Sequence, residues 1–102
     1  MGKMLHTVNK SPFRTNDLQS CLRHLGDGAL LLIEDAVYAA TPGTRVADQV
    51  EQVASQNAVY VLANDLQARG VSQDQLIPGV KPVDYQGFVE LVVEHGTPQA
   101  WL

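Results

Sequence analysis

The stretch ALLLIE, residues 29–34, places five apolar side chains in a row before a carboxylate. A strand with one face in water alternates apolar and polar residues, whereas a strand covered on both faces is apolar throughout. The stretch therefore predicts a buried strand of a parallel sheet. Other short apolar runs predict further strands at MLHTV (4–8), AVYVLA (58–63), VKPVDY (80–85) and PQAWL (98–102).

Helical patterns alternate with these strands. In TNDLQSCLRHLGDG, residues 15–28, one helical face collects Leu18, Cys21, Leu22 and Leu25. Thr15 or Asn16 can cap this helix, and the glycines at 26 and 28 end it. Further helical segments are predicted at 35–40, 45–56, 64–70 and 85–95. Strands that alternate with helices predict an α/β domain with three layers, α/β/α, on a small and mostly parallel sheet.

Pro82 assigns the fourth strand to an edge or to a strand end, because proline donates no hydrogen bond to a neighbouring strand. The 102 residues suffice for one domain, so we expect a single domain over residues 1–102. Residues 1–3 are expected to be either a short native extension or a remnant added for expression, with Met4 as the original start.

Composition excludes several classes of protein. The net charge is −4, and the seven lysines and arginines are scattered singly, so direct binding of nucleic acid is not expected. No apolar run approaches the roughly 20 residues of a membrane helix, and no signal peptide is recognisable. One cysteine forms no internal disulfide. These features predict a cytoplasmic protein that does not contact membranes.

Cys21 is the one residue suited to nucleophilic chemistry, and two interpretations of it stay open. Its place among leucines indicates a buried, inert thiol that packs as a small hydrophobe. A reactive thiol needs a lowered pKa, and Cys21 lies beyond the first helical turn, where the helix dipole has faded. His24, three residues on, can lie beside it on the helix. A metal site needs more ligands than Cys21 and His24 supply, so no metal is expected.

Other polar residues support no complete active site. Glu34 and Asp35 follow the second strand, at the sheet edge where α/β proteins place their sites. Two adjacent carboxylates are suited to acid–base chemistry, but Asp35 is expected instead to cap the turn that follows. His6 is interpreted as a strand residue that packs. Without a combination of nucleophile, base and orienting group, the chain is not expected to be a stand-alone enzyme.

Several segments together resemble one known family. LHTVNKSPF (5–13), LLLIEDAVYAA (30–40), VYVLANDLQARG (59–70), VDYQGFVELV (83–92) and the closing QAWL (99–102) are similar to the DsrH/TusB family of sulfur-relay proteins, in order and over residues 4–102. Within the family the similarity is closest to the DsrH subunit of the DsrE–DsrF–DsrH complex. The resemblance implies a DsrE-like fold, a three-layer domain around a five-stranded sheet, and no cofactor.

The resemblance also implies a function. The chain would be a subunit of a cytoplasmic sulfurtransferase complex, a heterohexamer with DsrE/TusD-type and DsrF/TusC-type subunits. That complex moves persulfide sulfur to a DsrC/TusE-type carrier, in sulfur oxidation or in 2-thiolation of the tRNA wobble uridine. Cys21 matches the first-helix cysteine of DsrH members, which favours sulfur oxidation, and TusB members generally lack this thiol.

Two roles for this subunit follow from the resemblance. In the first, Cys21 accepts persulfide sulfur, by attack of its thiolate on the outer sulfur of a persulfide. In the second, the subunit is purely structural and supports the catalytic cysteine of the DsrE-type subunit. His24 and Trp101 are the candidate interface residues, because a tryptophan is typical of subunit interfaces. His6, Lys10 and Ser11, in the N-terminal motif, are interpreted as packing or assembly residues.

Overall fold

The computed structural model describes residues 3–102, in which five strands alternate with helices. The strands are β1 (Leu5–Val8), β2 (Ala29–Leu32), β3 (Val59–Leu62), β4 (Val80–Val83) and β5 (Gln99–Trp101). The helices are α1 (Asp17–Arg23), α2 (Ala47–Ala54), α3 (Ala63–Ala68) and α4 (Tyr85–His95), with the 3-10 helices η1 (Glu34–Ala40) and η2 (Gln73–Gln75). The sequence-predicted strands and helices are confirmed. The expected extension at 1–3 lies partly outside the described residues.

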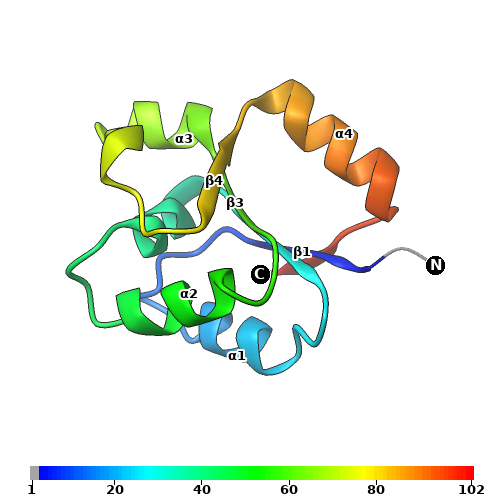
Figure 1. Ribbon diagram of the computed structural model, residues 1–102, viewed down its shortest axis with the longest axis horizontal. Helices are drawn as coiled ribbons and strands as arrows, with labels where there is room; N and C mark the ends of the chain where they lie inside the picture. Colours follow the sequence, from blue (N-terminus) through cyan, green and yellow to red (C-terminus); the bar gives the residue numbers. More distant parts are fainter. Residues whose placement is uncertain (1–2) are drawn as a thin grey trace.

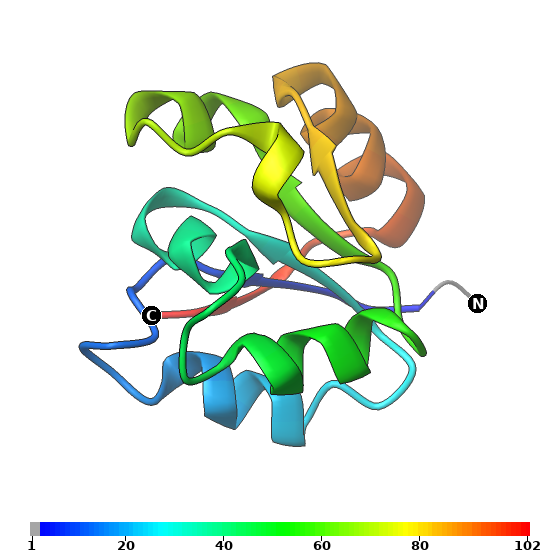
Figure 2. The ribbon, with the colours of Figure 1, turned by 60° about the vertical axis from the view of Figure 1, so that its left-hand side comes forward.

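The strands form one sheet in the order β4-β3-β2-β1-β5, and every neighbouring pair is parallel. α1 and α2 lie on one side of this sheet, while α3 and α4 lie on the other (Figures 1 and 2). The α/β fold with layers on both faces is therefore confirmed. β4 is an edge strand, as Pro82 predicts.

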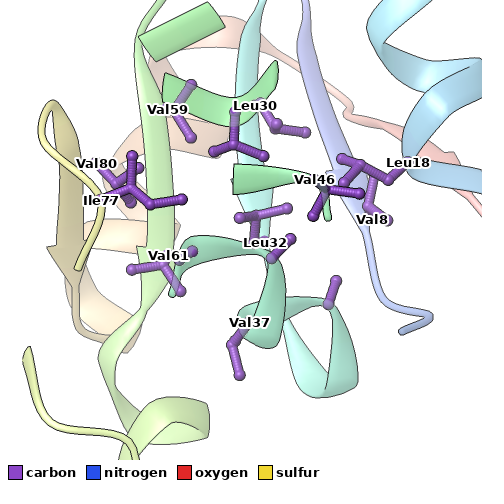
Figure 3. Close-up of a cluster of buried hydrophobic side chains, with 14 of the residues drawn as sticks. Val8, Leu18, Leu30, Leu32, Val37, Val46, Val59, Val61, Ile77 and Val80 are labelled. Atoms are coloured by element: carbon purple, nitrogen blue, oxygen red, sulfur yellow. The ribbon is translucent and has the colours of Figure 1, made fainter. Parts of the chain in front are cut away.

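Both faces of β2 are buried, which explains its unbroken apolar sequence. Leu30 and Leu32 belong to the larger core cluster, beneath α1 and α2, whereas Ala29 and Leu31 belong to a smaller cluster beneath α4. The larger cluster joins the sheet to α1, α2, η1 and the segment that precedes β4 (Figure 3). A strand that must fill two cores has no position for a polar side chain.

A glycine allows the tight return from α1 into β2. A Cβ on Gly28 would lie 2.8 Å from the Met4 carbonyl oxygen and 2.9 Å from the Leu25 carbonyl oxygen. Both are backbone atoms, and the Met4 oxygen accepts a hydrogen bond from Ala29 N at 2.8 Å. Gly26 ends the helix with a left-handed φ of 57°, as expected, but Gly28 is required for close approach of the backbone.

The structure confirms one prediction of a helix cap, that of Thr15, and corrects another, that of Asp35. At α1 the Asn16 side chain accepts no capping hydrogen bond, and the Thr15 hydroxyl accepts one from Asp17 N at 3.3 Å. At η1 the expected cap by Asp35 is wrong, because the Glu34 N–H donates to Asp65 Oδ2 at 2.6 Å. The acceptor comes from α3, which no local pattern around residue 35 reveals.

Candidate functional site

Cys21 lies in the core of the α1 layer. The side chain is 0% exposed and belongs to the larger apolar cluster, with Leu18 and Leu25 of the same helical face. The spacing of apolar residues in α1 predicts this position, because Cys21 shares the period of the leucines that face the sheet. Neither a reagent nor a partner sulfur atom reaches the thiol in this arrangement.

Burial also changes the acid–base chemistry of the thiol. The loss of hydration raises the pKa of Cys21 from 9.0 to about 12, because the charged thiolate is disfavoured in an apolar environment. A catalytic cysteine requires the opposite, a pKa lowered by a nearby cation or a helix N-terminus. Within this chain, Cys21 has the environment of a packing residue.

His24 does not act on the thiol through a hydrogen bond. Its imidazole Nδ1 lies 2.8 Å from the Ser20 carbonyl oxygen on the preceding turn, and its ring lies 5.6 Å from the Trp101 ring, between centroids. Its contact with Cys21 is a backbone one, in which the His24 N–H donates a hydrogen bond to the Cys21 carbonyl oxygen at 3.0 Å. The side chain of His24 is exposed.

Trp101 joins β5 to β1. Its indole Nε1–H donates a hydrogen bond to Nδ1 of His6 at 3.1 Å, and the two rings stack with centroids 6.3 Å apart. Because Nδ1 accepts this bond, the neutral His6 ring carries its proton on Nε2. His6 is 4% exposed, and burial, followed by the proximity of His24, lowers the pKa of His6.

The three aromatic side chains therefore form a small cluster, which we define as His6, His24 and Trp101. It closes the β5 edge of the sheet on the side of α1. All three residues are candidates from the sequence, but their contacts are not predictable from it, since His6 and Trp101 lie 95 positions apart. The cluster holds no nucleophile. It is suited to anchoring the C-terminal strand and to presenting a half-buried indole with an exposed imidazole.

Carboxylates gather at the carboxyl edge of the sheet, where two of them pair with a guanidinium. Arg69 Nε donates to Asp35 Oδ1 at 2.9 Å, and Arg69 Nη1 lies 4.0 Å from Asp65 Oδ1. Asp65 also accepts a hydrogen bond from the backbone N–H of Glu34. Glu34 is the one non-glycine residue of the described chain with a positive φ, 50°. These contacts tie η1 to α3. Asp35 and Asp65 are therefore occupied by structural contacts and are not arranged as an acid–base pair.

The N-terminal motif shapes a turn. The Ser11 hydroxyl accepts a hydrogen bond from Phe13 N at 3.2 Å, and the Ser11 carbonyl oxygen accepts one from Arg14 N at 3.1 Å. Lys10 is exposed.

Over residues 3–102, no group of three or more His, Cys, Asp and Glu side chains is arranged to hold a metal. No helix in that part of the chain has the length and apolar character needed to cross a membrane.

Comparisons with known proteins agree with the resemblance noted in the sequence. A family model described as "DsrH like protein" matches residues 10–97. The TusB proteins of Shigella flexneri and of Escherichia coli O139:H28 (strain E24377A / ETEC) are each 40% identical to this chain over 99 residues. That alignment covers 96% of this chain and 100% of each relative.

Solved structures show the same fold at lower identity. The ychN protein of E. coli has a TM-score of 0.83 and 22% identity, covering 98% of this chain and 99% of its own. The MTH1491 protein of Methanobacterium thermoautotrophicum has a TM-score of 0.75 and 18% identity, covering 95% and 96%. From the family model and the TusB relatives together, the chain belongs to the DsrH-like family, as its N-terminal and C-terminal segments predict.

Proposed function

We propose that this protein is a subunit of a cytoplasmic sulfur-relay complex and that its role there is architectural. Family membership supports the place in a sulfur relay. The single observation that supports the architectural role is the complete burial of Cys21, whose thiol also has a pKa raised to about 12. A relay residue must receive sulfur from one protein and pass it to another, which requires access and a thiolate.

The partners follow from the family. DsrE/TusD-type and DsrF/TusC-type subunits would complete a heterohexamer, and a DsrC/TusE-type carrier would receive the persulfide sulfur. The DsrE-type subunit would hold the reactive cysteine. The relatives named TusB favour tRNA thiolation as the destination of the sulfur over sulfur oxidation. In this assembly His24 and Trp101 would contact a neighbouring subunit, since one side chain is exposed and the other is half-buried.

The rival role assigns a sulfur-transfer step to Cys21. Its thiolate would attack the outer sulfur of a persulfide, a new S–S bond would form on Cys21, and the donor cysteine would leave as a thiolate. This step requires that the thiol leave the leucines of α1 when the complex assembles. If the role is architectural instead, removal of the Cys21 sulfur atom leaves sulfur transfer by the complex intact.

Sulfur transfer by the assembled complex tests the proposal. The chain is co-expressed with its DsrE-type and DsrF-type partners, and transfer from a persulfide donor to the carrier is followed by mass spectrometry. We expect the Cys21→Ala complex to transfer sulfur at a rate within about twofold of wild type, because alanine keeps the site apolar. A complex that assembles but no longer transfers sulfur would make Cys21 an acceptor. A chain that does not assemble with these partners would contradict the place in the relay.

A further inference from the structure

The outward side of α4 carries a stripe of apolar side chains. Tyr85, Val89 and Val93 follow one another at four-residue spacing, which places them on one side of a helix. Each is exposed, from 56% for Tyr85 to 79% for Val93. The other exposed large hydrophobics of the described residues are Met4, Phe13 and Leu102, which lie on separate segments. The α4 stripe, defined as Tyr85, Val89 and Val93, is therefore a concentration of apolar surface.

Its two borders differ. On one side the stripe continues into Phe88 and Val92, which are half-buried against the smaller core cluster. On the other side the helical spacing places Glu90 and Glu94 in a neighbouring row, and both are exposed. The surface thus passes from the core, through an exposed apolar stripe, to an acidic row. Neither carboxylate forms an ion pair within residues 3–102.

We propose that the α4 stripe is a docking surface for a different protein chain, one that presents an apolar patch bordered by lysine or arginine. The inference rests on the proposed function, because the partner would be one of the sister subunits. An apolar centre with a charged border is the usual anatomy of a protein interface. The acidic row selects the sign of the partner's border, since like charges placed side by side across an interface are costly.

A second copy of this chain fits the surface poorly. If two copies of α4 packed antiparallel about a two-fold axis, the flank that carries Glu90 would lie beside the same flank of the other copy. Each carboxylate row would then face another carboxylate row, in a chain with a net charge of −4. A basic partner instead neutralises the row. The antiparallel pair of copies is therefore disfavoured, and the negative charge of the row favours a partner chain with a basic border.

Paired charge insertions test the location of the contact. Val89→Glu with Val93→Glu adds two negative charges to the stripe, at exposed positions where the fold tolerates them. Gln52→Glu with Gln56→Glu adds the same charge to exposed positions of the opposite layer and is the matched control. The measurement is the dissociation constant of each variant with the co-expressed DsrE-type and DsrF-type subunits, with circular dichroism as the check of folding.

We expect the α4 variant to bind at least about tenfold more weakly and the control to bind like wild type. Glu90→Lys with Glu94→Lys should also weaken binding, and added salt should weaken wild type more than this variant. Equal binding by the α4 variant and wild type, or equal loss in the control, would overturn the inference while the proposed function stands. A wild-type dimer that the α4 variant abolishes would identify the occupant as a second copy and overturn it as well. A wild type that binds neither subunit contradicts the proposed function and this inference together.

Discussion

Alkylation of Cys21 in the native chain is expected to be slower than alkylation of an unfolded thiol by a factor of about a thousand or more. The alkylating reagent is iodoacetamide at pH 8, which reacts with the thiolate and not with the thiol. A pKa of about 12 in place of 9.0 lowers the thiolate fraction at this pH from about one in ten to about one in ten thousand. The thiolate fraction alone therefore falls roughly a thousandfold, and the greater nucleophilicity of the more basic thiolate offsets part of this factor in the rate.

Access gives an independent bound of similar size. Since Cys21 is 0% exposed, the reagent reaches it only when α1 opens or when the whole domain unfolds. A domain stabilised by about 5 kcal/mol is unfolded for roughly one part in several thousand of the time. Both routes to modification, through the native thiolate or through opening, are slow.

The assay follows the intact mass of the chain with time, in buffer and in concentrated urea. The urea sample supplies the rate for an accessible thiol in the same sequence, and Cys21→Ala supplies the control without an adduct. A series at low urea separates opening of α1 from global unfolding, because the slope with urea scales with the surface exposed. An alkylation rate of the native chain within tenfold of the rate in urea would show that the Cys21 thiol is accessible in the folded chain.

Further predictions concern stability, measured by urea unfolding. Cys21→Ser should destabilise the fold by about 1–3 kcal/mol, and more than Cys21→Ala does, because it buries a polar hydroxyl among apolar side chains. Equal stability of the serine variant and wild type would contradict an apolar site. Gly28→Ala should lower the free energy of unfolding by about 1–3 kcal/mol, because the added Cβ meets two backbone oxygens at 2.8 and 2.9 Å. An unchanged urea midpoint would show that the backbone between α1 and β2 can move to make room for a side chain. The lowered pKa of folded His6 means that the unfolded chain binds more protons, so the contribution of His6 to stability is complete above about pH 6.5 and is lost as the pH falls below that value. His6→Asn should lose less stability than wild type between pH 7 and pH 5, and identical profiles would exclude His6 as the source.

The strand pattern was predictable because it depends on near neighbours in the sequence. An apolar run such as residues 29–33 must be buried on all sides, which few kinds of secondary structure allow. Here it forms a strand of a parallel sheet that is buried on both faces. Pro82 predicts an edge for the same local reason, since its missing N–H cannot support two neighbouring strands. The burial of Cys21 followed from the period of the leucines beside it.

Contacts between distant segments were not predictable in this way. The acceptor for the Glu34 N–H is Asp65, 31 residues away, and it took the role expected of Asp35. The hydrogen bond from Trp101 to His6 depends on β5 pairing with β1, which follows from the topology and not from either sequence segment. The exposure of Val89 and Val93 likewise depends on which side of α4 faces the sheet.

In the proposed function, this subunit supports a sulfur relay without carrying sulfur on its own thiol. Intact-protein mass spectrometry of the co-expressed complex, after addition of a persulfide donor, tests it most directly, with Cys21→Ser in parallel. We expect this chain to keep its mass while the DsrE-type subunit gains sulfur. A one-sulfur increment on this chain that Cys21→Ser abolishes, and that the carrier then removes, would contradict the architectural role and make Cys21 a relay residue.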